Sequence, residues 1–159
     1  MFKFFKSKEF KMMAPITGKA MAISQVPDEV FAQKMLGDGV AIEPTDGLVV
    51  APCAGKVVQI FPTNHAVGME TKEGFDILIH LGIDTVELDG EGFERLVEEG
   101  QIVEMGTPLI KMDLEKVKEH GKSIISPVIV TTMDRISNME TITGDVVAGK
   151  DIIMSLKVK

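Results

Sequence analysis

Two histidines, His65 and His80, are the residues of this chain whose type and spacing are best suited to chemistry. His80 ends an apolar run and is followed by Leu81 and Gly82, so it can be held rigidly at the end of a strand with one face open to water. The stretch between His65 and His80 can run out and back as a hairpin, which would bring the two imidazoles together. A neutral imidazole nitrogen is a nucleophile that needs no separate base, and its ordinary pKa makes the neutral form the majority near neutral pH.

Five segments carry motifs that are specific enough to compare with known families: Val26–Gly39, Val50–Gly55, Phe61–Glu70, Phe75–Leu88 and Asp84–Phe93. They resemble segments of the glucose-type IIA component of the bacterial phosphoenolpyruvate-dependent sugar phosphotransferase system. The resemblance extends from Ala14 to the end of the chain. It implies a phosphotransferase component with a phosphohistidine intermediate, which acts in sugar uptake and requires no cofactor.

The resemblance also implies a role for each residue of the site. A histidine corresponding to His80 accepts phosphate from the phosphocarrier HPr and passes it to a cysteine of a IIB domain, and one corresponding to His65 assists. Nε2 of His80 is then the phosphorylated atom, its Nδ1 is held by a carbonyl near Gly82, and His65 donates a hydrogen bond to the phosphate. Thr63 is expected to orient His65, because residues two apart in a strand share a face. Such a transfer needs little beyond in-line positioning and cover for the phosphoryl charge.

Five apolar residues match family positions around the active site, and two aspartates are expected to flank the nucleophile. Asp28 and Asp84 are expected to form an acidic rim that meets a basic partner, and a pair of solvated loop carboxylates is the alternative. The apolar residues would exclude water from a labile phosphohistidine and provide a docking surface, unless they belong to the core; they are Phe31, Leu36, Phe61, Leu78 and Val86. Phe31 and Val86 lie beside turn residues, so these two are expected to be exposed.

The implied partners are HPr and the sugar-specific IIB domain of a IICB permease. A second function class stays open at this stage, namely a regulatory module that uses the same face to bind other proteins, with phosphate as the switch. Which sugar is carried is not encoded here, because another subunit binds it.

A zinc hydrolase is a third class, because His80 and Asp84 have the H-x-x-x-D spacing of some zinc peptidases. These enzymes need a further H-x-H pair, and the one histidine downstream is His120, beside a glycine at an expected helix end. The sequence therefore argues against that class. It leaves open a zinc ion shared between His65, His80 and a carboxylate of a partner, since adjacent imidazoles are competent ligands.

Short apolar runs separated by proline and glycine predict a mostly β fold, an antiparallel sandwich or barrel with two or three short surface helices. Strands are expected at Gly39–Glu43, Lys56–Phe61, Asp76–His80, Ile124–Ile125 and Val128–Thr132, and helices at Phe93–Gly100 and Asp113–Gly121.

An internal echo supports this architecture. Ala14–Lys19 recurs as Ala51–Lys56, and Val103–Ile110 recurs as Val146–Ile153. The repeated proline and glycine fix the same turn in two places, which predicts a duplicated, pseudo-symmetric β motif of the barrel-sandwich kind.

The length of 159 residues fits one domain, expected at residues 14–159, and residues 1–13 are expected to be a flexible basic tail. A net charge of −7 argues against nucleic-acid binding. The single cysteine, Cys53, and the lack of a signal peptide or apolar span predict a cytoplasmic protein. Weak attraction of the tail to an anionic membrane is an alternative, because its lysines alternate with phenylalanines.

Overall fold

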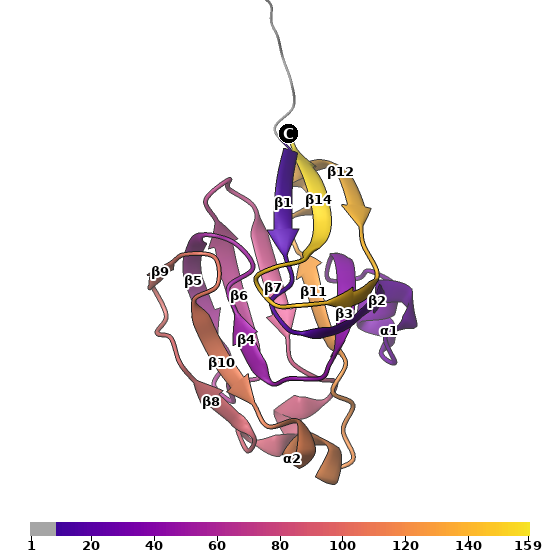
Figure 1. The fold of residues 1–159 in the computed structure, drawn as a ribbon, viewed down its shortest axis with the longest axis vertical. Coiled ribbons are helices and arrows are strands. Elements are labelled where there is room, and N and C mark those ends of the chain that lie inside the picture. The colour runs from indigo at the N-terminus through magenta and orange to yellow at the C-terminus, as the bar shows by residue number, and fades with distance from the viewer. Residues whose placement is uncertain (1–8) are drawn as a thin grey trace, which may run out of the picture.

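The computed structural model describes residues 9–159, which form a mostly β fold (Figure 1). The strands of these residues are β1 (Glu9–Met13), β2 (Gly18–Ala22), β3 (Asp38–Pro44), β4 (Leu48–Val50), β5 (Gly55–Ile60), β6 (Ala66–Thr71), β7 (Asp76–His80), β8 (Phe93–Arg95), β9 (Ile102–Val103), β10 (Pro108–Met112), β11 (Ser126–Val130), β12 (Ile136–Thr141), β13 (Gly144–Val146) and β14 (Ile152–Val158). The helices are α1 (Glu29–Ala32) and α2 (Leu114–Glu119), with single 3-10 turns η1 (Ile23–Gln25), η2 (Thr85–Leu88) and η3 (Met133–Arg135).

The strands form three antiparallel sheets around one core. The large sheet has the order β13-β2-β3-β11-β7-β6-β5-β9, and the two small sheets have the orders β1-β14-β12 and β4-β10-β8. Met12 of β1, Ile110 of β10 and Val128 of β11 belong to the same buried cluster although they come from three different sheets. The expected mostly β, sandwich-like fold with few short helices is therefore confirmed.

The large sheet buries both of its faces near the histidines. Ile77 and Ile79 of β7 point into the main core, and the alternate residue Leu78 points to the outer face. On that outer face a second, smaller cluster contains Phe31 of α1 and Ile129 of β11. The segment with η1 and α1 thus covers the outside of the sheet beside the end of β7.

The internal echo is a structural pseudo-symmetry. The Met13 N–H donates to the Pro52 carbonyl at 3.1 Å, and the Val50 N–H donates to the Pro15 carbonyl at 2.8 Å, so the two repeats bond to each other reciprocally. Each member of the second pair of repeats bonds to one member of the first pair in the same way, because the Gly106 N–H donates to the Ala51 carbonyl and the Gly149 N–H donates to the Ala14 carbonyl. The expectation of paired β units is confirmed by these matched contacts.

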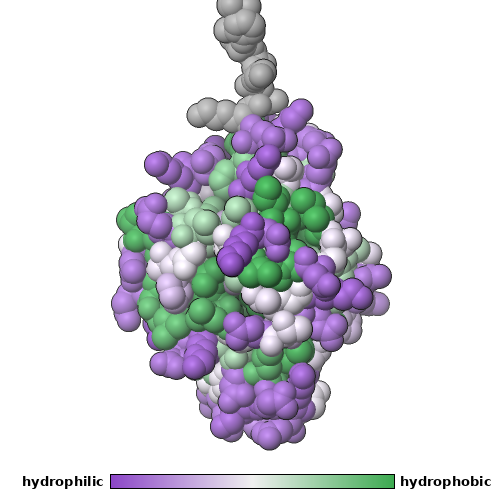
Figure 2. Space-filling view, viewed as in Figure 1, coloured by the Kyte–Doolittle hydropathy of each residue, from purple (hydrophilic) through white to green (hydrophobic). Residues whose placement is uncertain are grey.

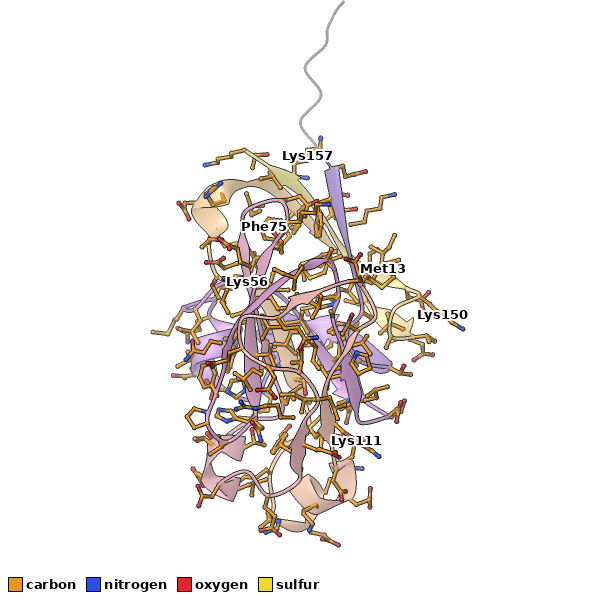
Figure 3. All side chains as sticks on the ribbon, turned by 90° about the vertical axis from the view of Figure 1, so that its left-hand side faces the viewer. Met13, Lys56, Phe75, Lys111, Lys150 and Lys157 are labelled. Carbon is orange, nitrogen blue, oxygen red and sulfur yellow. The ribbon has the colours of Figure 1, made fainter. Side chains whose placement is uncertain are left out.

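The expected tail boundary at residue 13 is wrong, because Glu9–Met13 is strand β1 and pairs with β14. Met12 is fully buried, and the ring of Phe10 packs edge-on against Phe75 with centroids 5.2 Å apart. Figure 3 shows Phe75 in the half of the molecule where Lys157 of β14 lies. The alternation of Lys11 outside and Met12 inside is a strand pattern that the basic composition obscured. The expected flexibility and membrane attraction of residues 1–8 lie outside the described residues.

Two expected elements are also wrong. Phe93–Gly100 is not a helix: its first three residues form β8, which pairs with β10 from Met112 to Ile110. Leu96, which the helical pattern placed on the apolar face, is 41% exposed. The segment is not helical because pairing of β8 with β10 outweighs its weak local helix preference. Ile124–Ile125 precedes β11 without joining a strand. The helix expected from Asp113 is present as α2, and the Asp113 carboxylate accepts the Lys116 N–H at 3.1 Å.

In the described part of the chain, we find no helix that is both long enough and apolar enough to span a bilayer. Apolar side chains on the face seen in Figure 2 occur in patches that charged and polar side chains interrupt.

Candidate active site

His80 is the last residue of β7 and is half-buried on the outer face of the large sheet. Its Nδ1 lies 2.8 Å from the carbonyl oxygen of Gly82. A carbonyl oxygen can only accept a hydrogen bond, so this contact holds the ring proton on Nδ1. Nε2 of the neutral ring is left with a free lone pair, which is the state that a nucleophile requires.

Gly82 must be a glycine for this geometry. Its φ of +77° lies in the left-handed region, which lets the chain turn back so that its carbonyl faces the preceding imidazole. A Cβ at this position would lie 2.6 Å from Cγ2 of Thr85 and 2.8 Å from the carbonyl oxygen of Ser123. A side chain at this position would therefore be strained and would also push the carbonyl away from His80.

His65 lies in the turn between β5 and β6 and is 4% exposed. Its Nδ1 is hydrogen-bonded to the hydroxyl of Thr63. A threonine hydroxyl can donate to that nitrogen, and in this arrangement His65 carries its proton on Nε2. The expected contact is present, but its geometric basis is a turn, with Asn64 at a φ of 59°, and not the alternation of a strand. The side chain of Arg95 holds this turn from β8 by donating from Nε to Oδ1 of Asn64 at 3.0 Å.

The two imidazoles lie next to each other. Their ring centroids are 5.1 Å apart, with the ring planes at 77°. The main chain fixes this approach, because β6 and β7 pair in a register that places Ala66 opposite His80, and the Leu81 N–H donates to the His65 carbonyl at 2.7 Å. The expected meeting of the two histidines is thus a property of the hairpin formed by β6 and β7.

Both imidazoles are held in the neutral form. Burial, and then the nearby His80, lower the pKa of His65 from 6.5 to about 4. Burial also lowers the pKa of His80, against the opposing effects of the Gly82 carbonyl and of the carboxylates of Asp28 and Asp84. Near neutral pH, therefore, His80 is an unprotonated nucleophile and His65 is a neutral hydrogen-bond donor.

The burial of His65 predicts a loss of stability at acid pH. Its pKa is 6.5 when the ring is free and about 4 in the folded chain, so the unfolded chain binds more protons between these values. The free energy of unfolding should consequently fall as the pH drops from 6.5 toward 4. Chemical denaturation at several pH values in this window should show a smaller fall for the His65→Gln variant, which lacks the titrating ring. Equal falls in parent and variant would assign the effect to other groups.

Comparison with known proteins identifies the family. The sequence profile of the family described as "phosphoenolpyruvate-dependent sugar phosphotransferase system, EIIA 1" matches residues 10–136. The chain belongs to this EIIA family. A glucose-specific EIIA component of Borreliella burgdorferi is 47% identical over 152 residues, which are 96% of this chain and 80% of that protein. The solved structure of glucose permease IIA from Mycoplasma capricolum has a TM-score of 0.88 and 41% identity, covering 98% of this chain and all of that one.

Some relatives contain the same domain within a longer protein. An N-acetylglucosamine-specific EIICBA component of Klebsiella pneumoniae is 50% identical over 149 residues, which are 93% of this chain but 23% of that protein. The EIIA chain is a phosphotransferase component, a phosphocarrier of the sugar phosphotransferase system. The fused relatives indicate that its partner is a sugar-specific component with EIIB and EIIC parts.

The five apolar residues that were expected around the EIIA site differ in their exposure. Val86 is 54% exposed and Leu36 is 47% exposed, while Phe61 and Leu78 are partly buried. The expected exposure of Phe31 is wrong: it is 5% exposed, because it fills the cluster between α1 and the large sheet. It nevertheless borders the site, since its ring centroid is 5.0 Å from that of His80; Phe61 contacts His65 similarly at 5.3 Å.

Asp28 and Asp84 both lie near His80, since the carboxylates of both raise its pKa. Asp28 is the N-cap of α1, where its Oδ1 accepts the Val30 N–H at 2.9 Å. Asp84 is exposed and has a left-handed φ of 59°. The two carboxylates thus come from different elements, and the fold brings both of them near the His80 ring.

Sequence reasoning missed two buried hydroxyls behind His80. Ser126 and Thr85 have no exposed surface, and both bond to the backbone around Gly82. Ser126 stands at the start of an otherwise apolar strand. An isolated polar residue in such a strand indicates a buried hydrogen bond, and this was the signal in the sequence that could have identified it.

The remaining singled-out residues have structural explanations. Nδ1 of His120 donates to the Lys116 carbonyl at 2.8 Å at the end of α2, as expected for a helix-terminal histidine. Cys53 is buried, and burial, followed by the charge of Glu73, raises the pKa of its thiol to about 12, so the thiol is unreactive.

Proposed function

We propose that His80 is the phosphorylated residue of this phosphocarrier, taking phosphate from phospho-HPr on Nε2 and giving it to a cysteine of a IIB domain. The observation that carries this proposal is the bond between Nδ1 of His80 and the Gly82 carbonyl, which leaves Nε2 as the free nucleophile beside His65. Incubation with phosphoenolpyruvate, enzyme I and HPr should produce an acid-labile phosphate on the chain. Absence of such a phosphate would remove the proposal.

Acceptance needs no proton transfer in this geometry. The lone pair of Nε2 attacks phosphorus in line, the bond from phosphorus to the donor imidazole breaks, and its electron pair returns to the donor ring. The proton on Nδ1 of His80 stays in its bond with the Gly82 carbonyl throughout. The positive charge that develops on the ring is stabilised by this carbonyl and by Asp28 and Asp84.

Onward transfer reverses the roles of the groups. A IIB thiolate attacks phosphorus, the N–P bond breaks, and the electron pair returns to Nε2 of His80. A thiolate carries a full negative charge, so its approach to the phosphoryl oxygens is opposed electrostatically. We assign His65, oriented by Thr63, the task of offsetting this by donating from Nε2–H to a phosphoryl oxygen.

The surface around His80 has the chemistry that a basic partner would recognise. Exposed Val86 and Leu36 would add apolar contact area, and the partly buried Phe61 borders the site through its contact with His65. Asp28 and Asp84 add negative charge close to His80. We therefore propose that HPr docks here, with opposite charges guiding the encounter and the apolar residues excluding water.

The double variant Asp28→Asn, Asp84→Asn should slow acceptance from phospho-HPr about tenfold at low ionic strength, with little effect in high salt. Thermal stability should be nearly unchanged, because asparagine also caps helices and tolerates a left-handed φ. The measurement is the rate of phosphoryl transfer at low and high salt.

The matched control is the double variant Glu104→Gln, Asp145→Asn. It removes two exposed carboxylates at opposite edges of the large sheet, one just after β9 and one in β13. It changes the net charge by the same amount and should leave acceptance near the parental rate. If both double variants slow transfer equally, general charge and not this rim guides the encounter.

We infer that the sugar is chosen by the partner. The Borreliella relative is named for glucose and the Klebsiella relative for N-acetylglucosamine, although both are about equally similar to this chain. The proposed acceptor is accordingly the cysteine-bearing IIB part of a IICB permease. We expect the reaction to occur in the cytoplasm, where such a partner would present its IIB part.

A zinc ion shared with a partner stays a separate proposal. Within residues 9–159, no group of three or more His, Cys, Asp or Glu side chains is arranged to hold a metal. His65 and His80 would supply two nitrogen ligands, so a partner carboxylate would have to complete the site.

A further inference from the structure

Two consecutive peptide units control the carbonyl that His80 contacts. The first joins the Leu81 carbonyl to the Gly82 N–H, and the second joins the Gly82 carbonyl to the Ile83 N–H. Each unit is planar, so only the two dihedral angles of Gly82 set their relative orientation. Whatever fixes both units therefore fixes the direction of the carbonyl that accepts from Nδ1 of His80.

The first unit is held at both ends by buried hydroxyls. The Thr85 hydroxyl donates to the Leu81 carbonyl at 2.6 Å, and the Gly82 N–H donates to Oγ of Ser126 at 3.1 Å. Ser126 in turn donates to the Ile124 carbonyl at 2.9 Å, so its lone pair is free for the Gly82 N–H. Both hydroxyl residues have no exposed surface, and water cannot replace either bond.

The second unit is held by the main chain and by the imidazole. The Ile83 N–H donates to the Ser123 carbonyl at 3.1 Å, and the Gly82 carbonyl accepts from His80 at 2.8 Å. A Cβ on residue 82 would come within 2.6 Å of the methyl carbon of Thr85, so the site accommodates only a glycine. Rotation about Gly82 would consequently break these hydrogen bonds.

We propose that Ser126 and Thr85 are positioning residues for the phosphoryl carrier. By fixing the peptide unit before Gly82, they aim its carbonyl at Nδ1 of His80 and thereby keep the ring proton there. Without them, the carbonyl can turn away, and the ring can carry its proton on Nε2, which is then unable to attack phosphorus. The effect on phosphoryl transfer rests on the proposed role of His80, whereas the effect on the ring proton does not.

Three variants test the hydroxyls separately from packing. Ser126→Ala and Thr85→Val each remove one hydroxyl and preserve the volume, while Thr85→Ser keeps the hydroxyl and removes the methyl group. The control is Thr71→Val, which removes another buried hydroxyl, the acceptor of the Phe75 N–H at 3.2 Å, at the other end of the β6–β7 hairpin. It should cost similar stability without touching the site.

The first measurement is the nitrogen-15 chemical shifts of the His80 ring in the unphosphorylated chain, which report which nitrogen carries the proton. Ser126→Ala and Thr85→Val should show a mixture of the two protonation forms, while the parent, Thr85→Ser and Thr71→Val keep the proton on Nδ1. Acceptance of phosphate should fall about tenfold in the first two variants only. The parental proton position in both hydroxyl-deleted variants would overturn the proposal, whatever residue carries the phosphate.

A measurement on the parent keeps the proposal testable if the variants do not fold. The Gly82 amide proton should exchange slowly with deuterated solvent, because Ser126 holds it in a buried hydrogen bond. Exchange as fast as that of exposed loop amides would overturn the proposed hold on this peptide unit.

Discussion

The His80→Ala variant is expected to accept no phosphate from phospho-HPr, with a loss of at least about ten-thousandfold in rate. The reason is that the neighbouring imidazole, His65, cannot substitute for Nε2 of His80. His65 is the nearest nitrogen base, but it is 4% exposed and its Nδ1 is bonded to Thr63. Radiolabelled phosphate transferred from phosphoenolpyruvate through enzyme I and HPr measures the acceptance directly.

The control for this loss is His120→Ala. This variant removes a histidine that is bonded to the Lys116 carbonyl at the end of α2, so it should accept phosphate like the parent. Stable phosphate on the His80→Ala variant, at His65 or anywhere else, would contradict the assignment of the nucleophile.

The His65→Gln variant should separate acceptance from delivery. Acceptance should remain within a few-fold of the parent, because neutral Nε2 of His80 is unchanged and its attack brings no new negative charge. Delivery to a IIB domain should fall by about a hundredfold or more, because the donor that would offset the repulsion between thiolate and phosphoryl oxygens is displaced. Rapid-quench measurements of the two half-reactions give both rates.

Thr63→Val provides a matched comparison, since it removes only the hydroxyl that bonds to Nδ1 of His65. It should produce a milder defect in the same half-reaction. Equal delivery rates for parent and His65→Gln would show that the pair formed by Thr63 and His65 is structural.

Much of the site could be predicted because short motifs specify local geometry. His80 stands two residues before Gly82, and a glycine there makes the left-handed turn that returns the carbonyl to the imidazole without the clash that a Cβ would cause. The β6–β7 hairpin could be predicted from two apolar runs with turn residues between them, and its register then brings His65 to His80. The repeated proline and glycine motifs likewise predicted paired β units.

The remaining features depend on tertiary contacts that local patterns do not encode. Phe31 was expected at the surface because turns flank it, yet α1 folds it onto Ile129 of the sheet. Residues 9–13 read as a basic tail because their partner strand, β14, lies at the other end of the chain. Phe93–Arg95 became a strand because β10 offers an edge for pairing. Ser126 contributes to the site from 44 positions beyond Gly82, a separation that no short motif spans.

We propose that Nε2 of His80 carries the phosphoryl group while Nδ1 keeps its proton in the bond to the Gly82 carbonyl. The most direct measurement is nuclear magnetic resonance of the chain phosphorylated through enzyme I and HPr, with phosphorus and nitrogen-15 spectra assigned to individual rings. We expect a single acid-labile phosphate on Nε2 of His80, with the Nδ1 proton still hydrogen-bonded. Phosphate on Nδ1 of His80, or on His65 or His120, would contradict the assignment of Nε2 of His80 as the phosphorylated atom.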